Sequence, residues 1–138
     1  MNEPKNRFHH GETGAVGWLI VMWLVVVAVI GVTAIDAGSI AFTKFSLADV
    51  ASNASTQAAN SFKGSQNVET ACQAAVVSIA ADDASAKLAN KGCVVDVPTG
   101  IVTITVRKEA KTILAGRLGF TKHFTKVTAT ETNGPTSL

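Results

Sequence analysis

The stretch that decides the fold is residues 15–35, AVGWLIVMWLVVVAVIGVTAI, which contains no charged side chain. As an α-helix rising about 1.5 Å per residue it would extend roughly 31 Å, which matches the hydrocarbon core of a bilayer. Trp18 and Trp23 lie near its first end, where indole rings suit the membrane interface. We therefore predict a transmembrane helix over residues 15–35. A buried core helix is the alternative, but no other segment is apolar enough to surround it.

The charges around this segment predict its orientation. Lys5 and Arg7 precede it, whereas only Lys44 follows closely, so the positive-inside rule places the N-terminus in the cytoplasm. Residues 1–14 are then a cytoplasmic leader, and the rest of the chain lies outside the membrane. Residues 32–34, Val-Thr-Ala, are similar to the small-residue pattern before a signal-peptidase cut, so a cleaved signal remains an alternative. The long apolar run favours the anchor.

Size and charge limit what the remaining chain can be. The 138 residues leave room for one modest domain after the apolar segment, which excludes a two-domain enzyme. A net charge of +2 and 6% aromatic residues do not form the basic, aromatic surface of a nucleic-acid-binding protein. We expect an extracytoplasmic region over residues 36–132 and a loose tail over residues 133–138.

The apolar helix is expected to continue outward as one long rod. Between Asp36 and Phe62 there is no Pro, and Gly38 is the only Gly. A stripe of residues recurs at three- and four-residue steps along this stretch, and its middle is made of small side chains. Another helix can approach such a stripe closely, whether it is this chain's second helix or belongs to a neighbouring subunit. The helix-packing stripe comprises Leu47, Ala51, Ala54, Ala58 and Phe62.

The later sequence predicts a second helix and a small sheet. Residues 68–90 are Ala-rich and are expected to form a helix that Lys91-Gly92 closes. Strands are predicted over residues 93–97 and 101–106, joined by Pro98-Thr99-Gly100, and a third strand over residues 124–132. Residues 111–119 are expected to form a short helical connection. The predicted fold class is α+β, with a second helix packed on an antiparallel sheet of about three strands.

The two cysteines, Cys72 and Cys93, do not form a CxxC motif. In an oxidising compartment the favoured interpretation is one disulfide that ties the second helix to the first strand. Two buried free thiols are the alternative. A metal site is less favoured because His9 and His10 would lie across the membrane from the cysteines.

No motif for catalysis or cofactor binding is present. The sequence lacks GxSxG, HExxH, a phosphate loop and GxGxxG, so we expect no catalytic, cofactor-binding or metal residues and no enzyme activity. Asp82 and Asp83 are interpreted as part of a solvated helix face, and His123 as a surface or strand residue. The C-terminal third is basic, and this face is either solvated or in contact with anionic lipid or wall polymer. Its cations are Arg107, Lys108, Lys111, Arg117, Lys122 and Lys126.

Six short motifs follow one another along the chain. The first half contains Gly14-Ala15-Val16 at the start of the apolar run, AIDAG at residues 34–38, and LADVASNA at residues 47–54. The later half contains ACQAA at residues 71–75, GCVVD at residues 92–96 and VTITV at residues 102–106. In this order the motifs resemble those of the TadE/TadG-like proteins of tight-adherence (Flp) pilus systems, in particular actinobacterial members, and the resemblance covers most of the chain.

This resemblance implies a pilin-like fold and a structural role as a minor pilin-like component, in the membrane or in the filament. The implied partners are membrane lipid, other pilin-like or pilus-assembly proteins, and a prepilin peptidase that cuts between Gly14 and Ala15. Precursors of this kind carry Glu at the fifth mature position, but here that position is Leu19. A cut after Gly11, before Glu12, would place Val16 there. The alternative function is a membrane-anchored envelope protein whose basic C-terminal region binds wall polymer, lipid or another protein.

Overall fold

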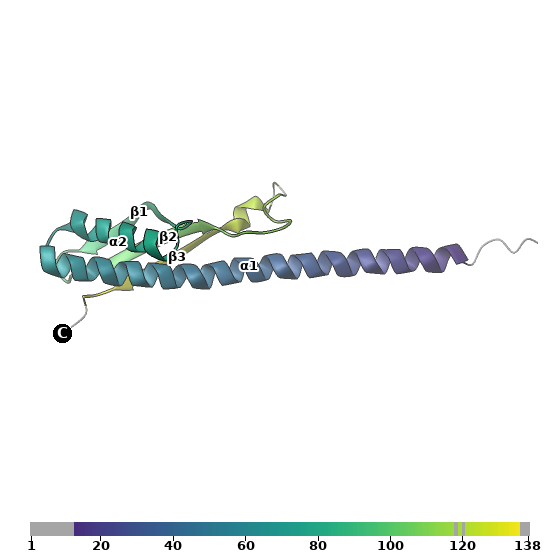
Figure 1. Ribbon diagram of the computed structural model, residues 1–138, viewed down its shortest axis with the longest axis horizontal. Coiled ribbons are helices and arrows are strands. Elements are labelled where there is room, and N and C mark those ends of the chain that lie inside the picture. Colours follow the sequence, from purple (N-terminus) through teal and green to yellow (C-terminus); the bar gives the residue numbers. More distant parts are fainter. Residues whose placement is uncertain (1–12, 118, 120, 136–138) are drawn as a thin grey trace, which may run out of the picture.

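A computed structural model of the protein describes residues 13–117, 119 and 121–135. It consists of two α-helices, a three-stranded antiparallel sheet of order β1-β2-β3, and a short 3-10 helix, η1. Figure 1 shows α2 and the sheet packed beside the C-terminal half of α1, while the N-terminal half projects alone. The predicted α+β class is therefore confirmed. The elements are α1 (Thr13–Ser65), α2 (Val68–Asp82), β1 (Lys87–Asp96), β2 (Ile101–Glu109), η1 (Lys122–Thr125) and β3 (Lys126–Asn133).

The first half of α1 is bare. Every large apolar side chain from Val16 to Ile30 is exposed, and even the most covered of them, Val26, is 44% exposed. A core helix would bury these side chains, so that alternative is wrong. In the described part of the chain this is the one helix long and apolar enough to cross a membrane, and it is compatible with a membrane anchor.

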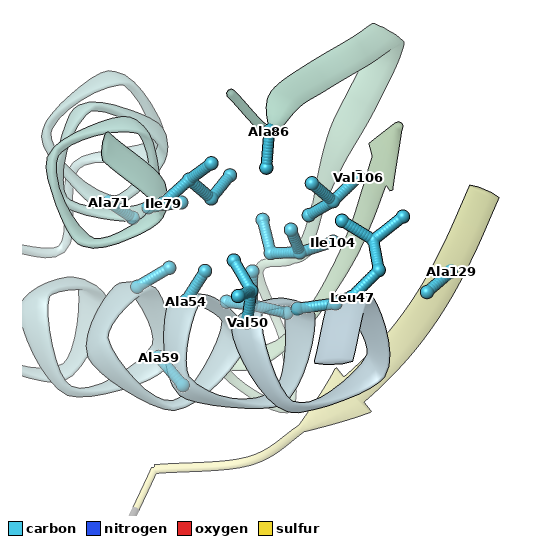
Figure 2. Close-up of a cluster of buried hydrophobic side chains, with 14 of the residues drawn as sticks. Leu47, Val50, Ala54, Ala59, Ala71, Ile79, Ala86, Ile104, Val106 and Ala129 are labelled. Atoms are coloured by element: carbon cyan, nitrogen blue, oxygen red, sulfur yellow. The ribbon is translucent and has the colours of Figure 1, made fainter. Parts of the chain in front are cut away.

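The second half of α1 forms the core together with α2 and one face of the sheet. Leu47 on α1 packs with Ile104 and Val106 of β2, whereas Ala71 and Ile79 enter the same cluster from α2 (Figure 2). Small alanines on α1 allow the helices to approach closely. Apolar burial of this kind is the main force that holds such a small domain together.

The second helix is shorter than predicted. It ends at Asp82, and the backbone N–H of Asp83 donates to the Ile79 carbonyl at 2.9 Å. The Asp83 carboxylate then accepts the Ser85 backbone N–H at 2.9 Å and the Ser85 hydroxyl at 2.6 Å. This Asx turn offers the backbone an alternative to the next helical turn, so the predicted continuation to Asn90 is wrong.

A wide bulge interrupts β1 where the sequence indicated the end of a helix. Leu88 pairs with Val106 and Cys93 pairs with Ile104, so four residues of β1 face one residue of β2. A Cβ on Gly92 would lie 2.5 Å from the Thr105 carbonyl oxygen, which explains why glycine is found there. The Lys91-Gly92 pair therefore shapes a bulge in the strand and does not close a helix.

The predicted hairpin and third strand are present with shifted ends. The second strand begins at Ile101 as expected, and β3 covers Lys126–Asn133. Asn133, expected to begin the loose tail, ends β3 instead, and its side-chain amide donates to Ser55 Oγ on α1 at 2.6 Å. Residues 136–138 lie outside the described residues.

Candidate functional site at the end of the apolar helix

Among the described residues, the one buried charged residue is Asp36, the first charged residue after the apolar half of α1. Only 6% of this residue is exposed. Its oxygens accept the backbone N–H groups of three consecutive residues of the segment between β2 and β3. The donors are Ile113 at 2.6 Å, Leu114 at 2.9 Å and Ala115 at 2.9 Å.

These bonds favour the charged form of Asp36. The N–H groups of Ile113, Ala115 and Leu114 lower the pKa of this carboxyl below its usual value, and the desolvation of the group, which acts in the opposite direction, is smaller than their sum. A carboxylate that accepts several backbone N–H bonds is a strong local anchor, because bonds to an ionised acceptor are stronger than neutral ones. The helix thus holds the segment by charge-assisted bonds.

We call the described residues between 110 and 125 (110–117, 119 and 121–125) the Asp36 loop. Its base is closed by the backbone N–H of Ala110, which donates to the Thr125 carbonyl at 2.8 Å. A second contact to α1 comes one helical turn after Asp36, where the hydroxyl of Ser39 donates to the Lys111 carbonyl at 2.6 Å. Figure 1 shows this loop extending from the sheet along α1, toward the bare half of the helix.

The short helix predicted over residues 111–119 is absent from residues 111–117. The segment is instead a series of turns, in which the backbone N–H of Arg117 donates to the Leu114 carbonyl at 2.9 Å. Sequence reasoning interpreted Asp36 only as the end of the apolar run. No local signal in residues 110–125 identifies a partner that is more than 70 positions away.

The outer surface of the Asp36 loop is both apolar and basic. Ile113 is 53% exposed, Leu114 38% and Phe124 66%. The cations Lys111 and Arg117 are exposed on the same loop, and Lys126 is exposed directly after it. The side chain of Lys122 is outside the described structure. This surface therefore combines large apolar side chains with positive charge at the level where the apolar helix ends.

The predicted disulfide between Cys72 and Cys93 is present and joins α2 to β1, with 5.9 Å between the two Cα atoms. No free cysteine remains. The crosslink holds the helix against the strand next to the bulge. It is a structural element of the domain.

The helix-packing stripe is covered by other residues of this chain. Each of its members is at most 2% exposed, covered by α2 and the sheet. A neighbouring subunit cannot reach these side chains while the domain is folded, so the stripe is not an exposed assembly surface. The residues are Leu47, Ala51, Ala54, Ala58 and Phe62.

Asp83, which was interpreted as solvated, forms an ion pair with Lys108 of β2. The hydrogen bond from Lys108, followed by that from Ser85, lowers the pKa of Asp83 to about 2. Asp82 is more exposed and accepts the side-chain amide of Asn53 on α1 at 3.1 Å. The interpretation of both acids as a simple solvated face was therefore wrong for Asp83.

The processing residues Gly14 and Ala15 lie in the first turns of α1, and cleavage between them stays a prediction. Lys5, Arg7, His9, His10, Gly11 and Glu12, on which the orientation and the second cleavage site depend, lie outside the described residues. Within the described ranges no group of three or more His, Cys, Asp or Glu side chains could hold a metal ion.

No family model, curated protein or solved structure matches this chain. The resemblance to TadE/TadG-like proteins rests on the motifs quoted above.

Proposed function

We propose that this protein is a minor pilin-like component of a tight-adherence (Flp) pilus, with a structural role in pilus assembly at the membrane or in the filament. It crosses the membrane once, with the N-terminus in the cytoplasm and the disulfide-linked domain outside. Its partners are membrane lipid and the helices of other pilin-like or assembly proteins. The assignment to the TadE/TadG-like family is part of the proposal.

The observation that carries this proposal is the continuity of α1. A single helix of 53 residues forms both the bare apolar segment and the central element of the domain. A simple tether needs only a flexible linker between the anchor and the domain, because a tether transmits no orientation. A continuous helix packed into the domain instead fixes the domain relative to the membrane segment, as an assembly subunit requires.

The fold also indicates where neighbouring helices would contact α1. Because the helix-packing stripe is buried, the surface of α1 that remains accessible to other helices is its apolar half. Gly17, Gly31 and Gly38 are spaced at multiples of seven, within roughly 60° of one another around the helix. An added Cβ at each would meet nothing within 4 Å, so this line of the helix is open. Small residues of this kind allow close helix contacts in a membrane.

The Asp36 site gives a physical reason for one element of the family resemblance. The AIDAG motif at residues 34–38 contains Asp36 and Gly38. Asp36 fixes the Asp36 loop, and Gly38 leaves an open position on the helix. Each of these two residues therefore has its own structural role, and these roles support the proposal in addition to the sequence resemblance.

Helix association can be tested with a matched pair of substitutions in the apolar half. Gly31→Leu adds four side-chain carbons to the open line, whereas Val29→Leu places the same leucine side chain about 200° away on the same helix, with one carbon more than the native valine. We expect Gly31→Leu, but not Val29→Leu, to reduce co-purification with pilus components and to reduce piliation. Unchanged co-purification and piliation in both variants would contradict an assembly role through this helix face.

A membrane-anchored envelope protein with a basic binding region is the second candidate. The exposed Lys111, Arg117 and Lys126 favour it, since they form a positive surface on the domain. It predicts salt-sensitive binding of the protein to anionic polymer that is lost when Lys122 and Lys126 are neutralised. Binding to anionic polymer that does not depend on salt, together with reduced piliation in the Gly31→Leu variant, would favour the pilus component.

A further inference from the structure

We infer that the Asp36 loop is a second membrane contact, which lies in the bilayer interface and binds anionic phospholipid headgroups. This inference rests on the proposed membrane crossing by α1. It assigns to the loop a role separate from helix assembly, namely to fix the depth and tilt at which the domain sits on the membrane.

The first step is the axial level of the loop. The uncharged run ends at residue 35, so a helix that spans the hydrocarbon core with residues 15–35 places Asp36 at the edge of that core. The backbone of Ile113 and Leu114 is bonded directly to the Asp36 carboxylate. These two residues therefore lie at the same level as the outer end of the membrane segment, and their side chains are exposed there.

The second step is the chemistry of the exposed surface. The exposed Ile113 and Leu114 would be costly to leave in water beside a membrane that can take them up. Lys111 and Arg117 are exposed on the same loop, and cations near an anionic membrane surface are attracted to it. Apolar side chains together with basic ones are the composition of segments that lie in the interface plane.

The third step concerns rigidity. The loop is closed at its base by the Ala110–Thr125 backbone bond and fixed to α1 through Asp36 and Ser39. Its apolar residues are therefore presented to the membrane without a further ordering cost. The unbroken helix carries the same constraint to the rest of the domain, so two contacts with the bilayer would determine the tilt.

The test uses nitroxide labels on the full-length protein in vesicles of phosphatidylcholine, with and without phosphatidylglycerol. Cysteines are introduced singly at Ile113, at Val26 in the apolar half, and at the exposed Gln73 on α2, with the native disulfide kept oxidised. Accessibility to a water-soluble relaxation agent is compared with accessibility to oxygen. We expect the Ile113 label to be severalfold less accessible to the aqueous agent than Gln73 in phosphatidylglycerol vesicles.

The charge contribution is tested by Lys111→Gln combined with Arg117→Gln, which should move the Ile113 label back toward water. Equal immersion with and without phosphatidylglycerol would overturn the headgroup assignment. A water-exposed Ile113 label would overturn the membrane contact itself. Immobilisation of the Ile113 label only after other envelope proteins are added would also overturn the membrane contact. The Val26 label separates this failure from failure of the membrane crossing, because it must remain deep in the bilayer if α1 spans it.

Discussion

The carboxylate of Asp36 accepts the backbone N–H of Ile113 at 2.6 Å and so joins two residues that lie 77 positions apart. This bond connects the end of the apolar helix to the segment between the last two strands. A domain that otherwise touches only the second half of α1 is thereby extended to the level where the apolar half ends (Figure 1). The position of the Asp36 loop is therefore set by the helix.

Replacing Asp36 by Ala should release this loop while the rest of the domain remains folded. The three amides of Ile113, Leu114 and Ala115 would lose their acceptor, so their hydrogen exchange should accelerate strongly. Exchange in β2 should stay slow. Asp49→Asn, at an exposed position of the same helix, is the control. Unchanged protection of residues 113–115 in Asp36→Ala would contradict the assigned anchor.

The ion pair between Asp83 and Lys108 should make stability depend on acid pH. The pKa of Asp83 is lowered from 3.8 to about 2, so its contribution is complete above about pH 4 and disappears as the pH falls toward 2. The Asp83→Asn variant should lose less stability than the wild type over this window. Denaturant unfolding at a series of pH values measures the difference. Parallel pH profiles for the two proteins would exclude the ion pair as a source of stability.

The disulfide between Cys72 and Cys93 should contribute about 3 kcal/mol to the free energy of unfolding, as expected for a crosslink that closes a loop of this length. Cys72→Ser combined with Cys93→Ser should lower stability by about that amount, and reductant should have no further effect on the double variant. Denaturant titration with and without reductant provides the measurement. A wild-type protein insensitive to reductant would show that the crosslink contributes little.

Bulk added to the buried stripe should destabilise the isolated protein. Ala54 is completely buried between α1, α2 and the sheet, so Ala54→Leu should cost about 1–3 kcal/mol through overpacking. Gln57→Leu changes an exposed position of the same helix and should alter stability by at most about 0.5 kcal/mol. Equal stability of the two variants would mean that the stripe is not packed within the chain.

The elements that periodicity and turn residues define were predicted correctly from the sequence. The uncharged run and the absence of Pro up to Phe62 predicted one long helix, and Pro98-Thr99-Gly100 predicted the hairpin. The two cysteines were correctly paired, because they were the only two in the chain. These signals are local or leave a single choice.

The predictions that were wrong depended on contacts between residues distant in the sequence, or on a local turn that competes with the helix. The Ala-rich residues 84–90 favoured helix, but the Asx turn at Asp83 ends α2 first. The Asp36 loop takes its conformation from a carboxylate on α1, which no pattern in residues 110–125 reveals. The stripe was visible as a pattern, but only the fold shows that it is covered by this chain.

We propose that the chain keeps its apolar helix and acts with pilus components. The most direct measurement is the intact mass of the native protein, from membranes and from sheared surface fractions. We predict the mass of a chain that begins at Met1 or at Ala15. The protein should be recovered in membranes and together with the sheared filaments or their assembly complexes. The mass of a chain that begins at Ile35, found in a protein free of membranes and filaments, would contradict both the membrane anchor and the pilus role.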